Sequence, residues 1–126
     1  MDVPEDRRYT DQHEWVLETD GGYRIGITDF AQDALGDVVF VDIPEQEGDV
    51  STGDILAEVE STKSVGEVYA PFDGSIVATN PRLADEPELV NTDPYGDGWF
   101  VELAAESVDA GGLLDAAGYR ELTESD

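Results

Sequence analysis

Cysteine is absent from this 126-residue sequence, and histidine occurs once, as His13. The missing cysteines exclude disulfides, thiolate metal sites and a cysteine nucleophile. A single histidine leaves no pair of imidazoles for a metal ion or for acid–base relay. The segment 13–17 begins like the zinc-binding helix motif, but Leu17 stands where the second histidine is required. The composition therefore argues against an enzyme, and we expect His13 to be a half-buried strand residue.

Positive charge is also scarce, since 6 basic residues stand against 31 acidic ones and give a net charge of −25. Binding to nucleic-acid phosphates, or to an anionic membrane surface, needs lysine and arginine in numbers that this chain lacks. No run of about 20 apolar residues is present to span a bilayer, and residues 1–6 lack the basic and apolar regions of a signal peptide. We therefore expect a soluble protein of the cytoplasm, with neither nucleic-acid nor membrane partners.

The acidic excess has a physical cost, because like charges repel one another in the compact state. At about 1 M salt the Debye length shrinks to roughly 3 Å, which largely removes this repulsion. An acidic chain nearly free of lysine therefore indicates a salt-rich cytoplasm, as in a halophilic microbe, and we expect the fold to loosen at low salt. Asp93 and Asp97 flank a glycine-rich turn, but this turn lacks the ligand spacing of a calcium-binding loop, so no metal site is expected.

Apolar residues make up 40% of the sequence and recur in short, ordered segments, which excludes disorder for most of the chain. Short β-type segments between Gly-Asp turns predict a mainly β protein, a flattened barrel-sandwich of short strands. We expect one domain over residues 1–126, with loosely ordered ends at 1–6 and 121–126. The expected strands are 13–18, 23–27, 38–43, 55–60, 65–70, 75–79 and 99–103.

Helical segments are few. Thr28 is a good N-cap for a short helix over 29–35, and Gly36 is well placed to end that helix. Residues 81–91 contain two prolines and few periodic apolar residues, and they are expected to form an ordered loop. The Ala- and Leu-rich segment 108–122 is expected to be helical, with interruptions before it or within it at Gly111, Gly112 and Gly118.

Lysine occurs once, as Lys63, at the junction of the expected strands 55–60 and 65–70. Inward side chains of the first strand would anchor this hairpin and leave its tip exposed; they are Ile55, Ala57 and Val59. One interpretation is a solvated charge, since turns usually hold polar residues for solvation alone. The other is covalent attachment, because Lys63 is the one side chain with an amine that can be acylated. The neighbours suit a modifying enzyme, with small polar flanks and an acidic handle: Ser61, Thr62, Ser64, Glu60 and Glu67.

Ordered fragments over almost the whole chain form a more specific pattern. They are His13-Glu14-Trp15-Val16, 26–32, 35–41, Glu60-Ser61-Thr62-Lys63-Ser64, Ala70-Pro71, Gly74, Asn80, 87–91 and 93–99. With these fragments the sequence resembles the H-protein family of the glycine cleavage system. The resemblance implies a lipoyl-type β fold with flanking helical segments, and it implies that Lys63 becomes lipoyl-lysine. It also implies that the attachment turn is recognised through Glu60, Ser61, Thr62 and Ser64.

By this resemblance the protein is a non-catalytic carrier that works as a monomer. In that family the oxidised lipoyl dithiolane accepts an aminomethyl group while glycine decarboxylase, a pyridoxal-phosphate enzyme, decarboxylates glycine. An aminomethyltransferase then passes the methylene to tetrahydrofolate, and dihydrolipoyl dehydrogenase reoxidises the dithiol. The implied partners are these three enzymes and the enzyme that attaches lipoate.

The resemblance further implies a surface cleft that protects the loaded arm. By position, Glu14 and Glu67 resemble residues of that cleft, where a carboxylate could hold the aminomethyl ammonium. Two solvated acids at these positions are the open alternative. The chain departs from the family at Ala34, where some relatives have histidine, and at Thr62 and Ser64, where valine and alanine are common.

Other functions stay open. A lipoyl domain of another lipoate-dependent complex is shorter and linker-tethered, and the segment 13–15 has no place in it. A relay protein that donates its lipoyl group to other enzymes would share the attachment site. An unmodified interaction module is the alternative outside the carrier class. A biotin carrier is disfavoured because methionines are expected beside its lysine, and Met1 is the one methionine here.

Overall fold

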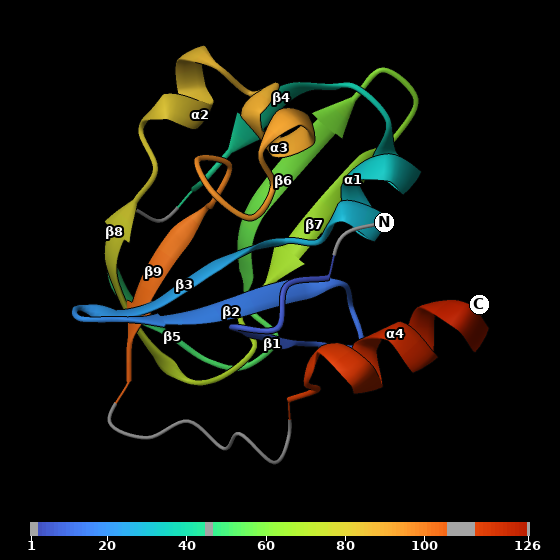
Figure 1. The fold of residues 1–126 in the computed structure, drawn as a ribbon. Helices are drawn as coiled ribbons and strands as arrows, with labels where there is room; N and C mark the ends of the chain where they lie inside the picture. The colour runs from blue at the N-terminus through green and yellow to red at the C-terminus, as the bar shows by residue number, and fades with distance from the viewer. Residues whose placement is uncertain (1–2, 45–46, 106–112, 126) are drawn as a thin grey trace.

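The computed structural model describes residues 3–44, 47–105 and 113–125. In these ranges the chain forms two antiparallel sheets of short strands and four helices (Figure 1). The larger sheet has the strand order β1-β2-β3-β9-β8-β5, and the smaller one has the order β4-β6-β7. The expectation of a mainly β fold built from short strands is confirmed.

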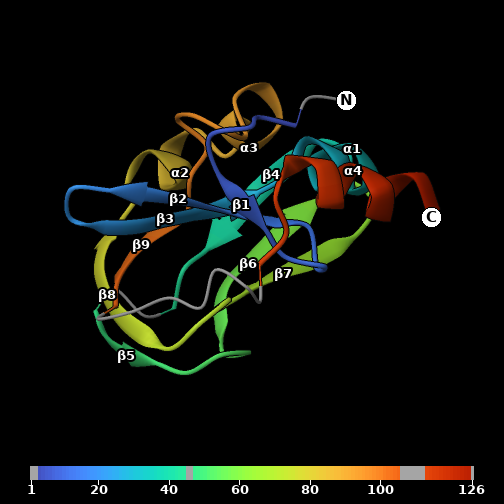
Figure 2. The ribbon, with the colours of Figure 1, turned by 60° about the horizontal axis from the view of Figure 1, so that its bottom comes forward.

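The strands of the larger sheet are β1 (Arg8–Tyr9), β2 (Glu14–Thr19), β3 (Gly22–Ile27), β9 (Val101–Ala104), β8 (Gly74–Thr79) and β5 (Gly48–Val50). Those of the smaller sheet are β4 (Val38–Asp42), β6 (Ile55–Ser61) and β7 (Val65–Tyr69). The helices are α1 (Asp29–Leu35), α2 (Arg82–Asp85), α3 (Leu89–Thr92) and α4 (Ala116–Ser125). Figure 2 shows the same arrangement after a turn of 60°.

The main core lies between the two sheets and takes apolar side chains from both. Fully buried members include Ile25, Val101, Leu103, Leu56, Val59 and Val68. Burying side chains of this size stabilises the fold by about 1.5–3 kcal/mol each. The two sheets thus hold β6 and β7, and with them the turn between these strands, on a packed base.

A second, smaller cluster packs under α4 and positions the start of β2. Tyr9 stacks on Tyr119 with ring centroids 4.8 Å apart, and Trp15 is 1% exposed. Trp15 lies flat against its cross-strand partner Gly26, where an added Cβ would come within 2.5 Å of the indole ring. This contact requires glycine at 26 and anchors the strand that begins with Glu14.

Helix α1 follows the expectation closely. The Thr28 side chain accepts the Ala31 N–H, and Gly36 ends the helix with φ 84°. His13 is half-buried as expected, but it precedes β2, has φ 67° and stacks on Phe30 at 4.4 Å. The expectation of a strand conformation at His13 was therefore wrong.

Three expectations about helices were also wrong. Residues 81–91, expected to be a loop, contain α2 and the start of α3, two single turns for which few periodic apolar residues are needed. Gly118 does not break α4, because its N–H donates to Asp115 Oδ1 (2.8 Å) and the next residue, Tyr119, is fully buried. Residues 121–125, expected to be loosely ordered, form the last turns of α4. Gly111, Gly112 and the start of the segment 108–122 lie outside the described residues.

The prediction of inward-facing side chains on β6 is confirmed for Ala57 and Val59 and was wrong for Ile55. Ala57 and Val59 are buried, whereas Ile55 is 42% exposed and Leu56 is buried in its place. The pairing of β6 with β7 shifts by one residue between Ile55 and Ala57. A bulge of this kind reverses the alternation of side chains on one side of it.

Candidate functional site

The Lys63 turn connects β6 to β7 and is closed by Ser61. The Ser61 N–H donates to the Ser64 carbonyl oxygen at 2.8 Å. Ser61 Oγ accepts the backbone N–H groups of Lys63 (3.3 Å) and Ser64 (3.0 Å). Serine hydroxyls commonly stabilise turns in this way. The turn residues that the sequence singles out are thus brought together, and Ser61 sets the backbone position of Lys63.

The turn is also attached to the connection between α1 and β4. The Thr62 N–H donates to the Asp37 carbonyl oxygen at 3.0 Å. The aliphatic stem of Lys63 lies over Gly36, where an added Cβ would come within 3.1 Å of Lys63 Cε. Because Gly36 also has a positive φ, a side chain there would strain the backbone and displace the lysine stem. Gly36 therefore ends the helix and supports the lysine at once.

Asn91, from α3, holds the same connection in place. Its Nδ2 donates to the Gly36 carbonyl oxygen (2.8 Å) and to Gln32 Oε1 (3.0 Å), and its Oδ1 accepts the Val38 N–H (2.8 Å). Asp37, whose carbonyl oxygen binds the lysine turn, lies between two residues that Asn91 fixes. Asn91 thus supports the Lys63 turn from behind.

The supporting role of Asn91 was missed in the sequence, where this residue appears only inside the fragment 87–91. The available signal was weak: a single amide follows two apolar residues, Leu89 and Val90, in a segment expected to be a loop. The contact joins residues 53 to 59 positions apart. Nothing in the local pattern points to that pairing.

The Lys63 side chain is exposed, and its ammonium forms no ion pair with a carboxylate of the described residues. Among the described residues, the amine therefore has no charged partner that must be displaced before an enzyme reaches it. Its backbone is held on both sides, while its Nζ is accessible. This combination fits acylation, which would convert the ammonium into a neutral amide.

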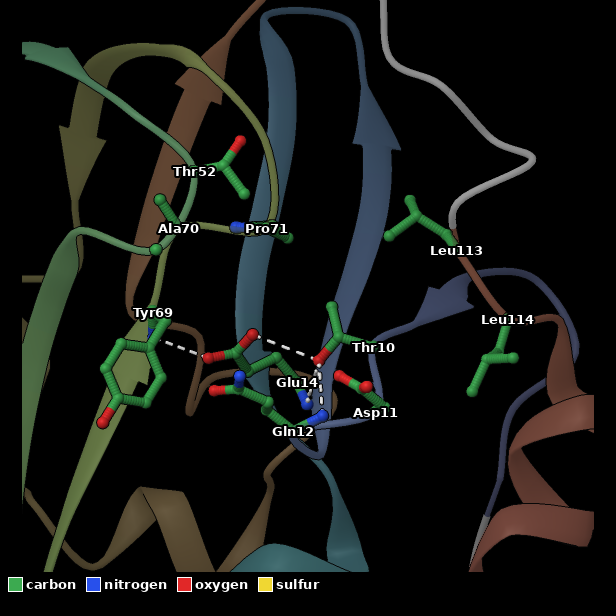
Figure 3. A pocket seen from close by; sticks show the side chains of 11 residues that line it. Thr10, Asp11, Gln12, Glu14, Thr52, Tyr69, Ala70, Pro71, Leu113 and Leu114 are labelled. Carbon is green, nitrogen blue, oxygen red and sulfur yellow. Dashed lines mark hydrogen bonds between the residues drawn. The ribbon is translucent and has the colours of Figure 1, made fainter.

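A pocket of about 300 Å³ lies at the other end of β7, and Glu14 lies against it (Figure 3). Glu14 is 2% exposed. One of its carboxylate oxygens accepts the Tyr69 N–H at 2.5 Å, and the other accepts the Thr10 hydroxyl at 3.1 Å. The remaining wall includes Thr52, Pro71 and Leu114. A buried carboxylate at a polar opening is a candidate for binding a cation.

Burial raises the pKa of Glu14 from its ordinary 4.5 to about 7, and the nearby Asp11 carboxylate adds to the rise. The hydrogen bonds from Tyr69 and Thr10 lower the pKa and offset part of this effect. Glu14 is therefore close to half ionised at neutral pH. A positive charge brought next to it would favour the carboxylate form.

Glu67 lies on the exposed face of β7, at the middle of the strand. The Tyr69 hydroxyl donates to Glu67 Oε1 at 3.4 Å, so Tyr69 contacts Glu67 through its side chain and Glu14 through its backbone. The side chains at 65, 67 and 69 point to the same face of β7. The four residue steps from 65 to 69 span about 13 Å. Of the two carboxylates that could have been merely solvated acids, Glu67 is exposed to solvent, whereas Glu14 is buried.

Other kinds of site find no support in the part of the chain that the structure describes. No group of three or more histidine, cysteine, aspartate or glutamate side chains there could hold a metal ion. None of the described helices has the length and apolar character needed to cross a membrane. The 10 residues of α4 are far short of the roughly 20 needed.

Known proteins resemble this chain in sequence and in structure. At 56% identity, the glycine cleavage system H protein of Mycolicibacterium smegmatis matches 96% of this chain and 96% of its own length. The glycine cleavage system H protein of Listeria monocytogenes is 48% identical, over 98% of this chain and all of its own. A crystal structure of a glycine cleavage system H protein from Mycobacterium marinum superposes with a TM-score of 0.87 at 42% identity, covering 97% of this chain and 99% of that one.

None of these three organisms supports the expectation of a halophilic source, which stays a prediction from composition. The family assignment is independent of it. The family model described as glycine cleavage H-protein matches residues 7–126 and therefore includes both the Lys63 turn and the Glu14 pocket. The chain belongs to the glycine cleavage H-protein family.

Proposed function

We propose that Lys63 carries a covalently bound lipoyl group and that the chain is the shuttle subunit of a glycine cleavage system. The observation that carries this proposal is the Lys63 turn. The chain's one lysine is exposed, is free of ion pairs with described residues, and stands on a turn that Ser61, Gly36 and Asn91 hold in place. Membership of the H-protein family supports lipoate as the acyl group.

When bound, the lipoyl group supplies a dithiolane that accepts a carbon fragment and two electrons. The chain contributes position and charge. The turn fixes Lys63 Cα, while the lysine stem leaves the arm free to reach a partner. Glu14 is placed to accept hydrogen bonds from an amine at the far end of the arm, in a site where water has little access. Glu67 lies on the exposed face between the turn and that pocket.

We infer four protein partners: glycine decarboxylase, the aminomethyltransferase, dihydrolipoyl dehydrogenase and the lipoate-attaching enzyme. A tether raises the local concentration of the arm at each of them, so the carrier needs no catalytic residues of its own. A single copy presents the whole site, which favours a monomer. Because the net charge of −25 would repel an anionic membrane, we infer that the protein works in the cytoplasm.

The proposed salt-rich setting has its own test. Because screening removes charge repulsion in the compact state, the melting temperature should rise between dilute buffer and molar KCl. Thermal unfolding followed by circular dichroism measures it. A melting temperature independent of KCl would contradict the halophilic proposal without touching the carrier function.

Intact-mass analysis of the protein from glycine-grown cells of its own host tests the main proposal. The expected result is one lipoyl mass, mapped by peptide sequencing to Lys63, and glycine decarboxylation on reconstitution with the three enzymes. Fully unmodified protein from those cells would refute the shuttle. A lipoyl mass without activity on reconstitution would favour a protein that relays lipoyl groups to other complexes.

A further inference from the structure

An apolar patch lies on the outer face of the smaller sheet, directly beside the Lys63 turn. Val39 is 55% exposed, Phe40 51% and Val65 61%, whereas large apolar side chains are usually buried. Phe40 pairs with Glu60 across β4 and β6, and Glu60 pairs with Val65 across β6 and β7. Directly paired residues point to the same face, so the side chains of Phe40, Glu60 and Val65 form one row across the sheet.

A bulge in β4 produces this exposure. The pairing of β4 with β6 shifts by one residue between Val38 and Phe40, which leaves Val39 as the extra residue. Regular alternation after the buried Val38 would turn Phe40 into the core. The bulge turns Phe40 outward instead, and both Val39 and Phe40 face solvent. Bulges are often found next to functional sites, where they re-aim a side chain.

Carboxylates accompany the apolar residues on the same face. Glu60 stands between Phe40 and Val65, and in the next row Glu58 pairs with Glu67. None of these three acids forms an ion pair with a cation of the described residues. We name Val39, Phe40, Val65, Glu58, Glu60 and Glu67 together the hairpin face.

The charge of the hairpin face restricts what can cover it. A second copy of this chain would bring another net charge of −25 and the same carboxylates against it. A fitting partner has an apolar contact surface bordered by arginine or lysine side chains, which would pair with the free acids. Val39, Phe40 and Val65 would form the apolar centre of such an interface, with Glu60 among them, and Glu58 and Glu67 would lie toward its rim.

We propose that the hairpin face is the docking surface for the enzyme that attaches the lipoyl group to Lys63, and that this enzyme covers it with an apolar patch rimmed by basic residues. The proposal rests on the proposed function. In the reaction, Lys63 Nζ loses a proton and forms an amide with the carbonyl carbon of an activated lipoyl group. The activated group is an acyl-adenylate or an acyl thioester, and the adenylate or thiol leaves.

Distance favours this enzyme over the other partners. The reacting atom is Lys63 Nζ itself, so the active site must lie over the turn. A standard interface of about 800 Å² per partner corresponds to a radius of roughly 16 Å. Val65 lies about 7 Å from Lys63 along the strand, and Phe40 is two strands further across, about 10 Å. The enzymes that act on the far end of the arm need not cover this row.

The test compares the rate of lipoylation of purified unmodified protein variants by the attaching enzyme. The variant Phe40→Thr/Val65→Thr removes the apolar row but keeps β-branched residues in the strands. We expect its kcat/KM to fall at least 10-fold, through KM, with an unchanged melting temperature. Val77→Thr is the matched control, because Val77 is 52% exposed on β8 of the other sheet; its kcat/KM should stay at the wild-type value.

A second pair of variants tests the basic rim. Glu58→Gln should lower kcat/KM about threefold in dilute buffer and reduce its dependence on KCl. Glu18→Gln changes the net charge equally at an exposed position of β2 and should leave both quantities unchanged.

The outcomes separate this proposal from the one on which it rests. Failure of wild-type protein to be lipoylated on Lys63 would refute the proposed function. Normal lipoylation of both wild-type protein and Phe40→Thr/Val65→Thr would refute only the docking surface. A loss of glycine decarboxylase binding without a loss of lipoylation would show that the occupant is a different enzyme. A dimer in analytical ultracentrifugation that the double variant abolishes would show that a second copy covers the face.

Discussion

The two ends of β7 differ in almost every physical respect. At one end the Lys63 turn is exposed and cationic, and it is held by backbone and serine hydrogen bonds within residues 61–64 and by one bond to the Asp37 carbonyl oxygen. At the other end the Glu14 pocket is anionic, and its carboxylate is buried and bound to a backbone N–H 55 residues away. One strand, about 13 Å long, connects an accessible amine to a sheltered carboxylate.

This difference shows how a carrier can divide its work. Acylation and delivery require that Lys63 be reachable, and they place few demands on its surroundings beyond a fixed backbone. Sheltering a charged group requires a site with little water, and such a site must be built from several elements. The predictions below test whether the two ends are separable in this way.

The largest effect is expected for Lys63→Arg. Arginine keeps the positive charge but cannot form the lipoyl amide. We expect complete loss of lipoylation and of glycine cleavage on reconstitution, with an unchanged free energy of unfolding, because the side chain is exposed. Mass spectrometry, the reconstituted assay and urea unfolding measure these quantities. Any retained glycine cleavage would show that the exposed end is not the attachment site.

Whereas Lys63→Arg should leave the free energy of unfolding unchanged, Glu14→Gln should change it by an amount that depends on pH. Since the pKa of Glu14 is about 7 in the folded protein and 4.5 ordinarily, the folded state binds more protons than the unfolded state between these values. The stability that this carboxyl contributes is therefore complete below about pH 4.5 and is lost as pH rises through about 7. Well above pH 7 the loss reaches about 3 kcal/mol for a shift of this size.

Glutamine is neutral at every pH, and its amide oxygen keeps an acceptor for the Tyr69 N–H. The free energy of unfolding of Glu14→Gln, relative to wild type, should thus rise by about 2.5 kcal/mol between pH 5 and pH 8. Urea titrations across this range measure the difference. Glu67→Gln is the matched control, since Glu67 is exposed. The same pH dependence in both variants would contradict the burial of Glu14.

The exposed end was largely predictable from the sequence, and the reason is local chemistry. Thr28 caps helix α1, Gly36 ends it and Ser61 closes the turn through atoms within a few residues, so these roles follow from their neighbours in the chain. The contact of Gly36 with the Lys63 stem is long-range and was not predicted. Ile55 was misplaced because its orientation depends on a bulge that forms only when β6 pairs with β7. Local pattern contains no trace of that pairing.

The buried end was predicted only in outline. Resemblance to the H-protein family drew attention to Glu14, but its burial could not be inferred where 31 of 126 residues are acidic. That burial depends on Thr10 before it and on Tyr69 far along the chain. Long-range contacts of this kind require the folded arrangement of both sheets.

Asn91→Ala tests how far the exposed end depends on elements behind it. The change leaves the Gly36 carbonyl and the Val38 N–H without their amide partner, which should cost about 2 kcal/mol in the free energy of unfolding. Asn91→Asp keeps an acceptor for the Val38 N–H and should recover part of this loss. Urea unfolding of both variants, with the lipoylation rate of each, checks the prediction. Equal stability of Asn91→Ala and wild type would show that α3 does not support the turn.

Ser61→Ala should have the smallest effect, because the N–H groups that it exposes at the turn can bond to water instead. We expect a loss of about 0.5 kcal/mol in the free energy of unfolding, at the low end for a hydrogen bond. Thr10→Val removes one hydroxyl too, but that hydroxyl donates to the buried Glu14. Its loss should cost about 1–2 kcal/mol and raise the pKa of Glu14 further. Urea unfolding at pH 8 compares the two variants directly. Equal losses would mean that exposure does not distinguish the two ends of β7, and the division between a reachable amine and a sheltered carboxylate would have to be abandoned.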